Sequence, residues 1–108
     1  MALDFHIGNN RKEATYQRAD ASLDLQSHTL FFKRFGLPEG KFTLFKRLED
    51  YYRDAKFSAE ELETLIDEVN QIKTLFSENT GLTLQLNQLL VVFEKGFKEQ
   101  KSIWVFCD

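Results

Sequence analysis

Two histidines and two aspartates in the first third of the chain are the side chains best suited to chemistry. Asp4 and His6 stand two residues apart in an alternating apolar and polar segment, so both point to one face of a strand. Asp24 lies in a second alternating segment, and His28 follows four residues later. Imidazole and carboxylate groups together bind Zn²⁺, Mn²⁺ or Fe²⁺. If the two segments are neighbours, the four residues form a candidate metal site.

The same four residues have two other interpretations. His6, paired with Asp4 or Asp24, could move protons near neutral pH as an acid–base catalyst. The chain has no G-x-S-x-G, no glycine-rich phosphate loop and no cysteine close to a histidine in sequence. The plainest interpretation is a polar strand face, which period-two alternation produces anyway. A small metal-dependent or acid–base enzyme centred on this group is therefore the alternative function.

Two strands near the N-terminus must position these residues. Residues 2–7 alternate, with Leu3 and Phe5 facing inward, and the Gly8-Asn9-Asn10 cluster predicts a turn. The polar stretch 11–19 predicts a loop. The second strand is predicted over about residues 21–26, with Leu23 and Leu25 facing inward.

Four helices are predicted between residues 27 and 100. The clearest begins at Ser58, whose spacing to Glu61 is that of a capping box, and its apolar stripe continues to Phe76. From caps and apolar spacing, the other three helices are predicted over about residues 27–35, 42–53 and 82–100.

The last strand is predicted over residues 102–107, which are β-branched and aromatic. Because it is apolar on both faces, it should lie between or beside the two N-terminal strands. Cys107 is expected to be a small core residue. The fold prediction is a single two-layer α+β domain over residues 1–108. Its mixed or antiparallel three-stranded sheet comes from both chain ends and residues 21–26, and about four helices pack on one face.

An aromatic pair on the last strand is the main candidate interface. Alternation turns Trp104 and Phe106 away from the helices, to the same side as the candidate metal ligands of the first strands. An exposed aromatic patch usually marks an interaction surface, and Trp is enriched among interface hot spots. Two alternatives stay open: the 11–20 loop folds over the patch, or the strand faces are reversed.

A second candidate surface is the acidic segment around two tyrosines. Tyr51 and Tyr52 are flanked by Asp50 and Asp54, so rigid rings and carboxylates together could hold a basic partner. Tyrosines at the end of an amphipathic helix are more often half-buried in the core, and we favour that interpretation here.

The charge distribution argues against nucleic acid as a partner. The chain has 14 Lys and Arg against 17 Asp and Glu, a formal charge of -3. Residues 33–47 hold five basic residues against one acid, a net of +4, whereas residues 49–68 hold eight acids against two bases, a net of -6. Nucleic-acid affinity needs a basic surface, so this alternation indicates a solvated surface or a protein-docking face.

The single cysteine excludes an intramolecular disulfide, and no apolar run approaches the length of a membrane span. The start of the chain has no secretory-signal pattern, so the cytoplasm is the expected compartment. In general character this compact, acidic chain with paired acidic tyrosines is similar to bacterial immunity proteins and small antitoxins, which implies action by binding and assigns no residues. We therefore predict a cytoplasmic, non-catalytic protein-interaction module or homodimer that needs no cofactor and binds neither nucleic acid nor membrane. The predicted interface comprises Trp104, Phe106, Tyr51, Tyr52, Asp50 and Asp54.

Overall fold

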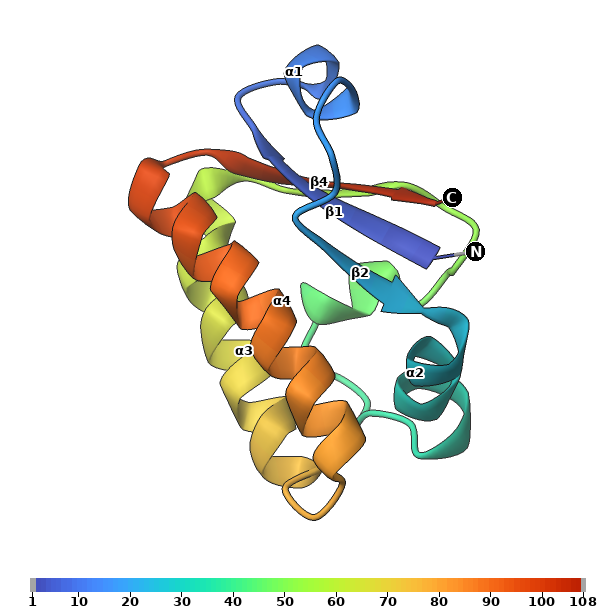
Figure 1. Cartoon of the computed structure of the whole chain (residues 1–108). Coiled ribbons are helices and arrows are strands. Elements are labelled where there is room, and N and C mark those ends of the chain that lie inside the picture. The colour runs from blue at the N-terminus through green and yellow to red at the C-terminus, as the bar shows by residue number, and fades with distance from the viewer. Residues whose placement is uncertain (1, 108) are drawn as a thin grey trace.

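The structure, a computed structural model, describes residues 2–107 and contains one antiparallel sheet (Figure 1). Within these residues the sheet has four strands in the order β2-β1-β4-β3. Its two central strands are formed by the chain ends, and its two edge strands by internal segments. The strands are β1 (Ala2–Gly8), β2 (Ala21–Asp24), β3 (Ala55–Phe57) and β4 (Ser102–Cys107).

The α+β prediction is confirmed, and the predicted number of strands is wrong. The additional strand, β3, has three residues and pairs Lys56 with Trp104 of β4. Three residues are too few for their alternation to predict a strand. Its pairing with β4 brings together residues almost fifty positions apart, which local sequence does not reveal.

Two long helices cover one side of the sheet (Figure 1). α3 (Leu62–Leu75) follows a short turn of helix, η3 (Ala59–Glu61), and α4 (Thr80–Glu99) follows after the cap residue Asn79. The capping box at Ser58 and Glu61 forms as predicted. Asn79 accepts a hydrogen bond from the Leu82 amide at 3.1 Å. Within residues 2–107, no helix has the combined length and apolar character that crossing a bilayer requires.

The region between β2 and β3 differs from the prediction. The Asp24 carboxylate accepts the Ser27 amide at 2.7 Å, so the strand ends there and helix α2 (Leu25–Thr29) begins, which leaves Leu25 exposed. α2 continues directly into a π-helical turn, η1 (Leu30–Arg34). The predicted helix over 42–53 is wrong.

Turns take the place of the predicted helix. Phe42 has a positive φ of 57°, which an α-helix cannot contain, and only a short 3₁₀ turn, η2 (Phe45–Leu48), follows. The predicted loop 11–19 contains a short helix, α1 (Arg11–Thr15), whose first turn is capped by Asn10.

The core lies between the sheet and the α3–α4 pair. Phe5 of β1 and Phe57 of β3 each set their rings edge-on to Phe93 of α4, with centroids 5.8 and 6.2 Å apart. Gly96 allows the end of α4 to approach β4 closely. A Cβ at this position would lie 2.8 Å from the Ile103 Cδ1 atom.

Candidate functional site

α3 and α4 do not cover the far side of the sheet, and the small helix α1 lies at one end of it (Figure 1). On β4, Trp104 and Phe106 alternate with the fully buried Ile103 and Val105, so their rings lie on this side. The register pairs Trp104 with His6, and Phe106 with Asp4. We call this surface the open face; its members are Asp4, His6, Lys56, Trp104 and Phe106.

The Trp104 ring is fixed from two directions. Its Nε1 donates a hydrogen bond to the Gly8 carbonyl oxygen at 3.1 Å. From the neighbouring edge strand, the Lys56 Nζ atom lies over the ring, 4.8 Å from its centroid. The indole is therefore half-buried, with the Lys56 side chain over its ring.

The Phe106 ring is covered in a similar way. The His6 ring lies beside it with centroids 5.2 Å apart, and the Arg11 guanidinium carbon lies 5.0 Å above its centroid. Arg11 is the first residue of α1, so the 11–20 segment does reach the aromatic pair, through one long side chain. His6 itself is buried, and its Nδ1 has no hydrogen-bond partner among the described residues.

Asp54 connects the open face to the tyrosine segment. One carboxylate oxygen accepts the Cys107 amide at 3.0 Å and the other pairs with Arg11 Nη2 at 3.0 Å. These two contacts, with the Cys107 backbone bond the larger, lower the pKa of Asp54. The Cys107 thiol in turn donates to the Tyr52 carbonyl oxygen at 3.4 Å. The two sequence-predicted surfaces are thus neighbours.

Cys107 is exposed, so its predicted place in the core is wrong. It stands at the end of β4, beyond the cover of α3 and α4. Desolvation and the adjacent Asp54 carboxylate raise the pKa of its thiol, so the protonated form predominates at neutral pH. Thiolate chemistry is disfavoured at this position.

The two adjacent tyrosines differ in burial. Tyr51 is buried among core residues, whereas Tyr52 is 66% exposed. Asp50 is exposed, and one of its carboxylate oxygens accepts the Tyr52 amide at 3.0 Å within a tight turn. Of the predicted segment, Tyr52 and Asp54 adjoin the open face.

The candidate metal ligands do not converge. Asp4 accepts the Ser22 hydroxyl at 2.7 Å on the open face, while Asp24 is occupied as the cap of α2. The helix that starts at Asp24 carries His28 into the interior, where its Nε2 lies 2.6 Å from the Leu48 carbonyl oxygen. Among residues 2–107, no group of three or more His, Cys, Asp or Glu side chains is placed to hold a metal ion.

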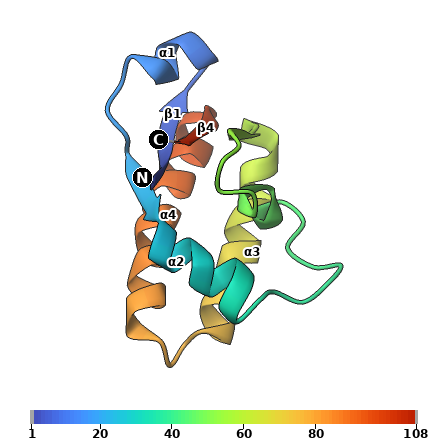
Figure 2. The same cartoon turned by 90° about the vertical axis from the view of Figure 1, so that its right-hand side faces the viewer.

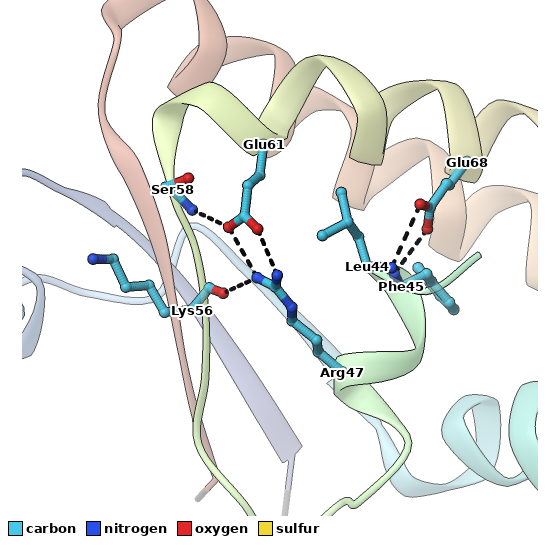
Figure 3. Close-up of polar contacts among 7 residues, drawn as sticks. All are labelled: Leu44, Phe45, Arg47, Lys56, Ser58, Glu61 and Glu68. Atoms are coloured by element: carbon cyan, nitrogen blue, oxygen red, sulfur yellow. Dashed lines mark hydrogen bonds and ion pairs between the residues drawn. The ribbon is translucent and has the colours of Figure 1, made fainter. Parts of the chain in front are cut away.

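The edge strand that carries Lys56 is held by an arginine clamp (Figure 3). Arg47 donates to the Lys56 carbonyl oxygen and to Glu61 Oε1, each at 2.9 Å, and Glu61 also accepts the Ser58 amide at 2.9 Å. The hydrogen bond from Arg47 is the main reason that the pKa of Glu61 falls to about 2. The clamp fixes β3 beside β4 and so places Lys56 over Trp104.

Both edges of the sheet are capped by side chains. At the β3 edge, Arg47 occupies the Lys56 carbonyl oxygen. At the β2 edge, the Gln85 side-chain amide donates to the Ser22 carbonyl oxygen at 2.7 Å. Occupied edge groups hinder the addition of a foreign strand.

Arg11 and Lys56 were not predicted as site residues. Arg11 lies in a segment that reads as a polar loop, and its contact with Phe106 spans almost the whole chain. Lys56 stands between Ala55 and Phe57, and this alternation is the only local signal of its outward direction.

Comparison of the chain with protein-family models, curated proteins and solved structures gives no match. A function must therefore be argued from the contacts and charges of the open face. Two of those charges lie on opposite sides of the aromatic pair: Lys56 is on the edge strand β3, and Asp4 is on β1.

Proposed function

We propose that this protein is a protein-interaction module whose open face binds a second copy of the same chain. The observation that carries the proposal is the placement of Trp104 and Phe106 on a sheet face that α3 and α4 leave uncovered. An aromatic centre with charged side chains around it is the usual composition of a protein interface.

The choice of a second copy rests on the register. The line that joins Lys56 to Asp4 crosses β4 between Trp104 and Phe106. A two-fold axis that lies in the interface and crosses this line at a right angle keeps the aromatic pairs of both copies at the centre. The same axis sets Lys56 against the partner's Asp4, because the two residues lie one strand to either side of β4 and two residues apart along it. The charge pattern is self-complementary about this axis.

The capped edges support face-to-face rather than edge-to-edge association. Arg47 and Gln85 occupy edge carbonyl oxygens, so continuing the sheet into a second copy would first break these bonds. The open face needs no such change, because its rings are already held by Gly8, Arg11 and Lys56. Preorganised side chains lose little conformational entropy on binding.

We place this association in the cytoplasm, as the sequence favours. The exposed thiol of Cys107 stands near the open face, and a reducing compartment keeps such a thiol from forming disulfides between copies.

A charge exchange tests the proposal. Lys56→Glu and Asp4→Lys each place like charges together across the two-fold axis, so each should weaken self-association by about tenfold or more. The double variant, Lys56→Glu with Asp4→Lys, restores opposite charges and should recover association, measured by sedimentation velocity. Lys95→Glu, an exposed change on α4, is the matched control.

The outcomes separate clearly. Recovery in the double variant, with Lys95→Glu unchanged, supports the two-fold arrangement. The arrangement is contradicted if Lys95→Glu weakens self-association as much as the single variants do, or if the double variant associates more weakly than both single variants. A wild-type chain that stays monomeric at every concentration contradicts self-association altogether and leaves a different protein as the occupant.

A further inference from the structure

A second surface lies at the other end of the helical layer, around the last residue of α3. Leu75 is 55% exposed and separates two clefts. The first cleft runs from Phe35, just after η1, to the turn between α3 and α4. The second is walled by the segment that follows η1, which swings out beside α3 (Figure 2). The residues that line the second cleft with Leu75 are Pro38, Lys41, Phe42, Gln71 and Thr74.

The first cleft is floored by aromatic rings. Phe35 is 52% exposed, and its ring lies 5.6 Å from that of Phe76, which in turn packs 5.5 Å from the buried Phe31. Phe35 is therefore anchored to the core while half of its surface faces solvent. Two large apolar side chains, Phe35 and Leu75, are exposed along the same cleft, and such pairing is typical of a binding surface.

The wall of the second cleft contains one residue in a strained backbone conformation, Phe42, and is held in place. Gly36, Gly40 and Phe42 all have left-handed φ values, of 70°, 74° and 57°, and Phe42 has a side chain that disfavours this conformation. Strained backbone persists where the surroundings enforce it, and it concentrates at ligand-binding segments.

A buried glutamate and a lysine enforce that shape. The Glu68 carboxylate, on α3, accepts the Phe45 amide at 2.9 Å and the Leu44 amide at 3.4 Å (Figure 3). The Lys46 Nζ atom donates to the Pro38 carbonyl oxygen at 2.5 Å. The segment is thus fixed at both ends, and the second cleft is present before any ligand arrives.

Two cations and one carboxylate lie at the clefts. The Arg34 guanidinium carbon lies 5.9 Å from the Phe35 ring centroid, and Lys41 lines the second cleft. Among the described residues, neither forms an ion pair with a carboxylate. Glu78, in the first cleft, opposes them. A ligand with apolar side chains and a surplus of carboxylates is complementary to this surface.

We propose that these two clefts bind an acidic, apolar segment of another protein. Its apolar side chains sit on either side of Leu75, and its carboxylates pair with Arg34 and Lys41. The site is separate from the open face, so one copy of the chain can bind such a segment while it is paired with a second copy.

A random-peptide library selected on the wild-type protein tests the site. We expect enriched peptides that carry apolar residues at intervals of three or four together with Asp and Glu. Leu75→Gln and Lys41→Glu should each weaken their binding at least tenfold, measured by fluorescence anisotropy. Leu75 is exposed, so folding is not at risk, and Leu84→Gln on α4, where the side chain is 57% exposed, is the matched control.

The single tryptophan distinguishes this site from the open face. Binding at the clefts leaves Trp104 fluorescence unchanged, whereas binding at the open face alters it. Each of three results would overturn the proposal: no enrichment, enriched peptides that bind Leu75→Gln as tightly as wild type, or enriched peptides that are basic. Loss of binding to Leu75→Gln alone, with Leu84→Gln intact, supports it.

Discussion

Arg11 and Asp54, forty-three positions apart, form an ion pair with Nη2 and Oδ2 3.0 Å apart, directly beside the Phe106 ring. The pair ties α1 to the segment that leads into β3. Asp54 also accepts the Cys107 amide, so the ends of three segments meet at one carboxylate. This junction lies between the aromatic pair of β4 and the exposed Tyr52, and its Arg11 side chain covers the Phe106 ring.

Replacing Arg11 tests how firmly α1 is held. Arg11→Ala should lower the free energy of unfolding by no more than about 1 kcal/mol, because both partners of the ion pair are partly exposed. Amide hydrogen exchange over residues 11–15 should accelerate strongly, since a five-residue helix is not stable alone. Arg18→Ala, in the same exposed segment, is the control for both measurements. Unchanged exchange in α1 would show that Arg11 does not restrain it.

The buried His28 predicts a pH dependence of stability. Burial, the largest cause, lowers the pKa of His28 below its ordinary value of 6.5. The unfolded chain therefore takes up this proton at a higher pH than the folded chain. As pH falls below 6.5, protonation favours the unfolded state, and the free energy of unfolding should decrease until the folded pKa is reached.

His28→Gln isolates this effect. The glutamine amide can donate to the Leu48 carbonyl oxygen as Nε2 does, but it does not titrate. Urea unfolding between about pH 7.5 and pH 5 should show a shallower pH slope in the variant than in wild type. Identical slopes would exclude His28 as the source.

Gly96 should tolerate no larger residue. Alanine usually stabilises a helix interior by about 1 kcal/mol relative to glycine. At Gly96, however, a Cβ would meet Ile103 Cδ1 at 2.8 Å and Leu62 Cδ1 at 3.1 Å, and both side chains are fully buried. We expect a net destabilisation of about 1–3 kcal/mol, measured by thermal and urea unfolding. Gly81→Ala, at the start of the same helix, is the control. There a Cβ has nothing closer than the Asn79 Oδ1 atom at 3.6 Å. A stabilised Gly96→Ala variant would contradict the close approach of α4 and β4.

Local patterns predict the parts of the fold that follow local rules. The capping box at Ser58 and the apolar stripe behind it lead directly to α3, and alternation assigns the faces of β1 and β4. The missing helix over 42–53 shows the limit. Its apolar residues have helical spacing, but they are buried by a short turn instead of a helix. This turn is held by a hydrogen bond to Glu68, which is more than twenty residues away in the sequence.

Local patterns likewise predict some features of the candidate site and miss those that depend on distant residues. Alternation places Trp104, Phe106 and Asp4 on one face, but it cannot show which long side chains cover the rings. His28 was misplaced because Asp24 ends its strand as a helix cap, and this turns the following residues into the interior. In the tyrosine segment the two adjacent rings pack edge-on with centroids 5.8 Å apart, and only the inner one, Tyr51, is buried, which the sequence does not reveal.

The central claim is that the open face binds a second copy of the chain. The most direct test combines light-scattering mass with acrylamide quenching of Trp104, the single tryptophan, over a wide range of protein concentration. We predict that the mass rises from 12.7 kDa toward twice that value as concentration increases, and that Trp104 becomes less accessible to the quencher over the same range. A constant mass of 12.7 kDa, or a dimer in which Trp104 stays equally accessible, would contradict the claim.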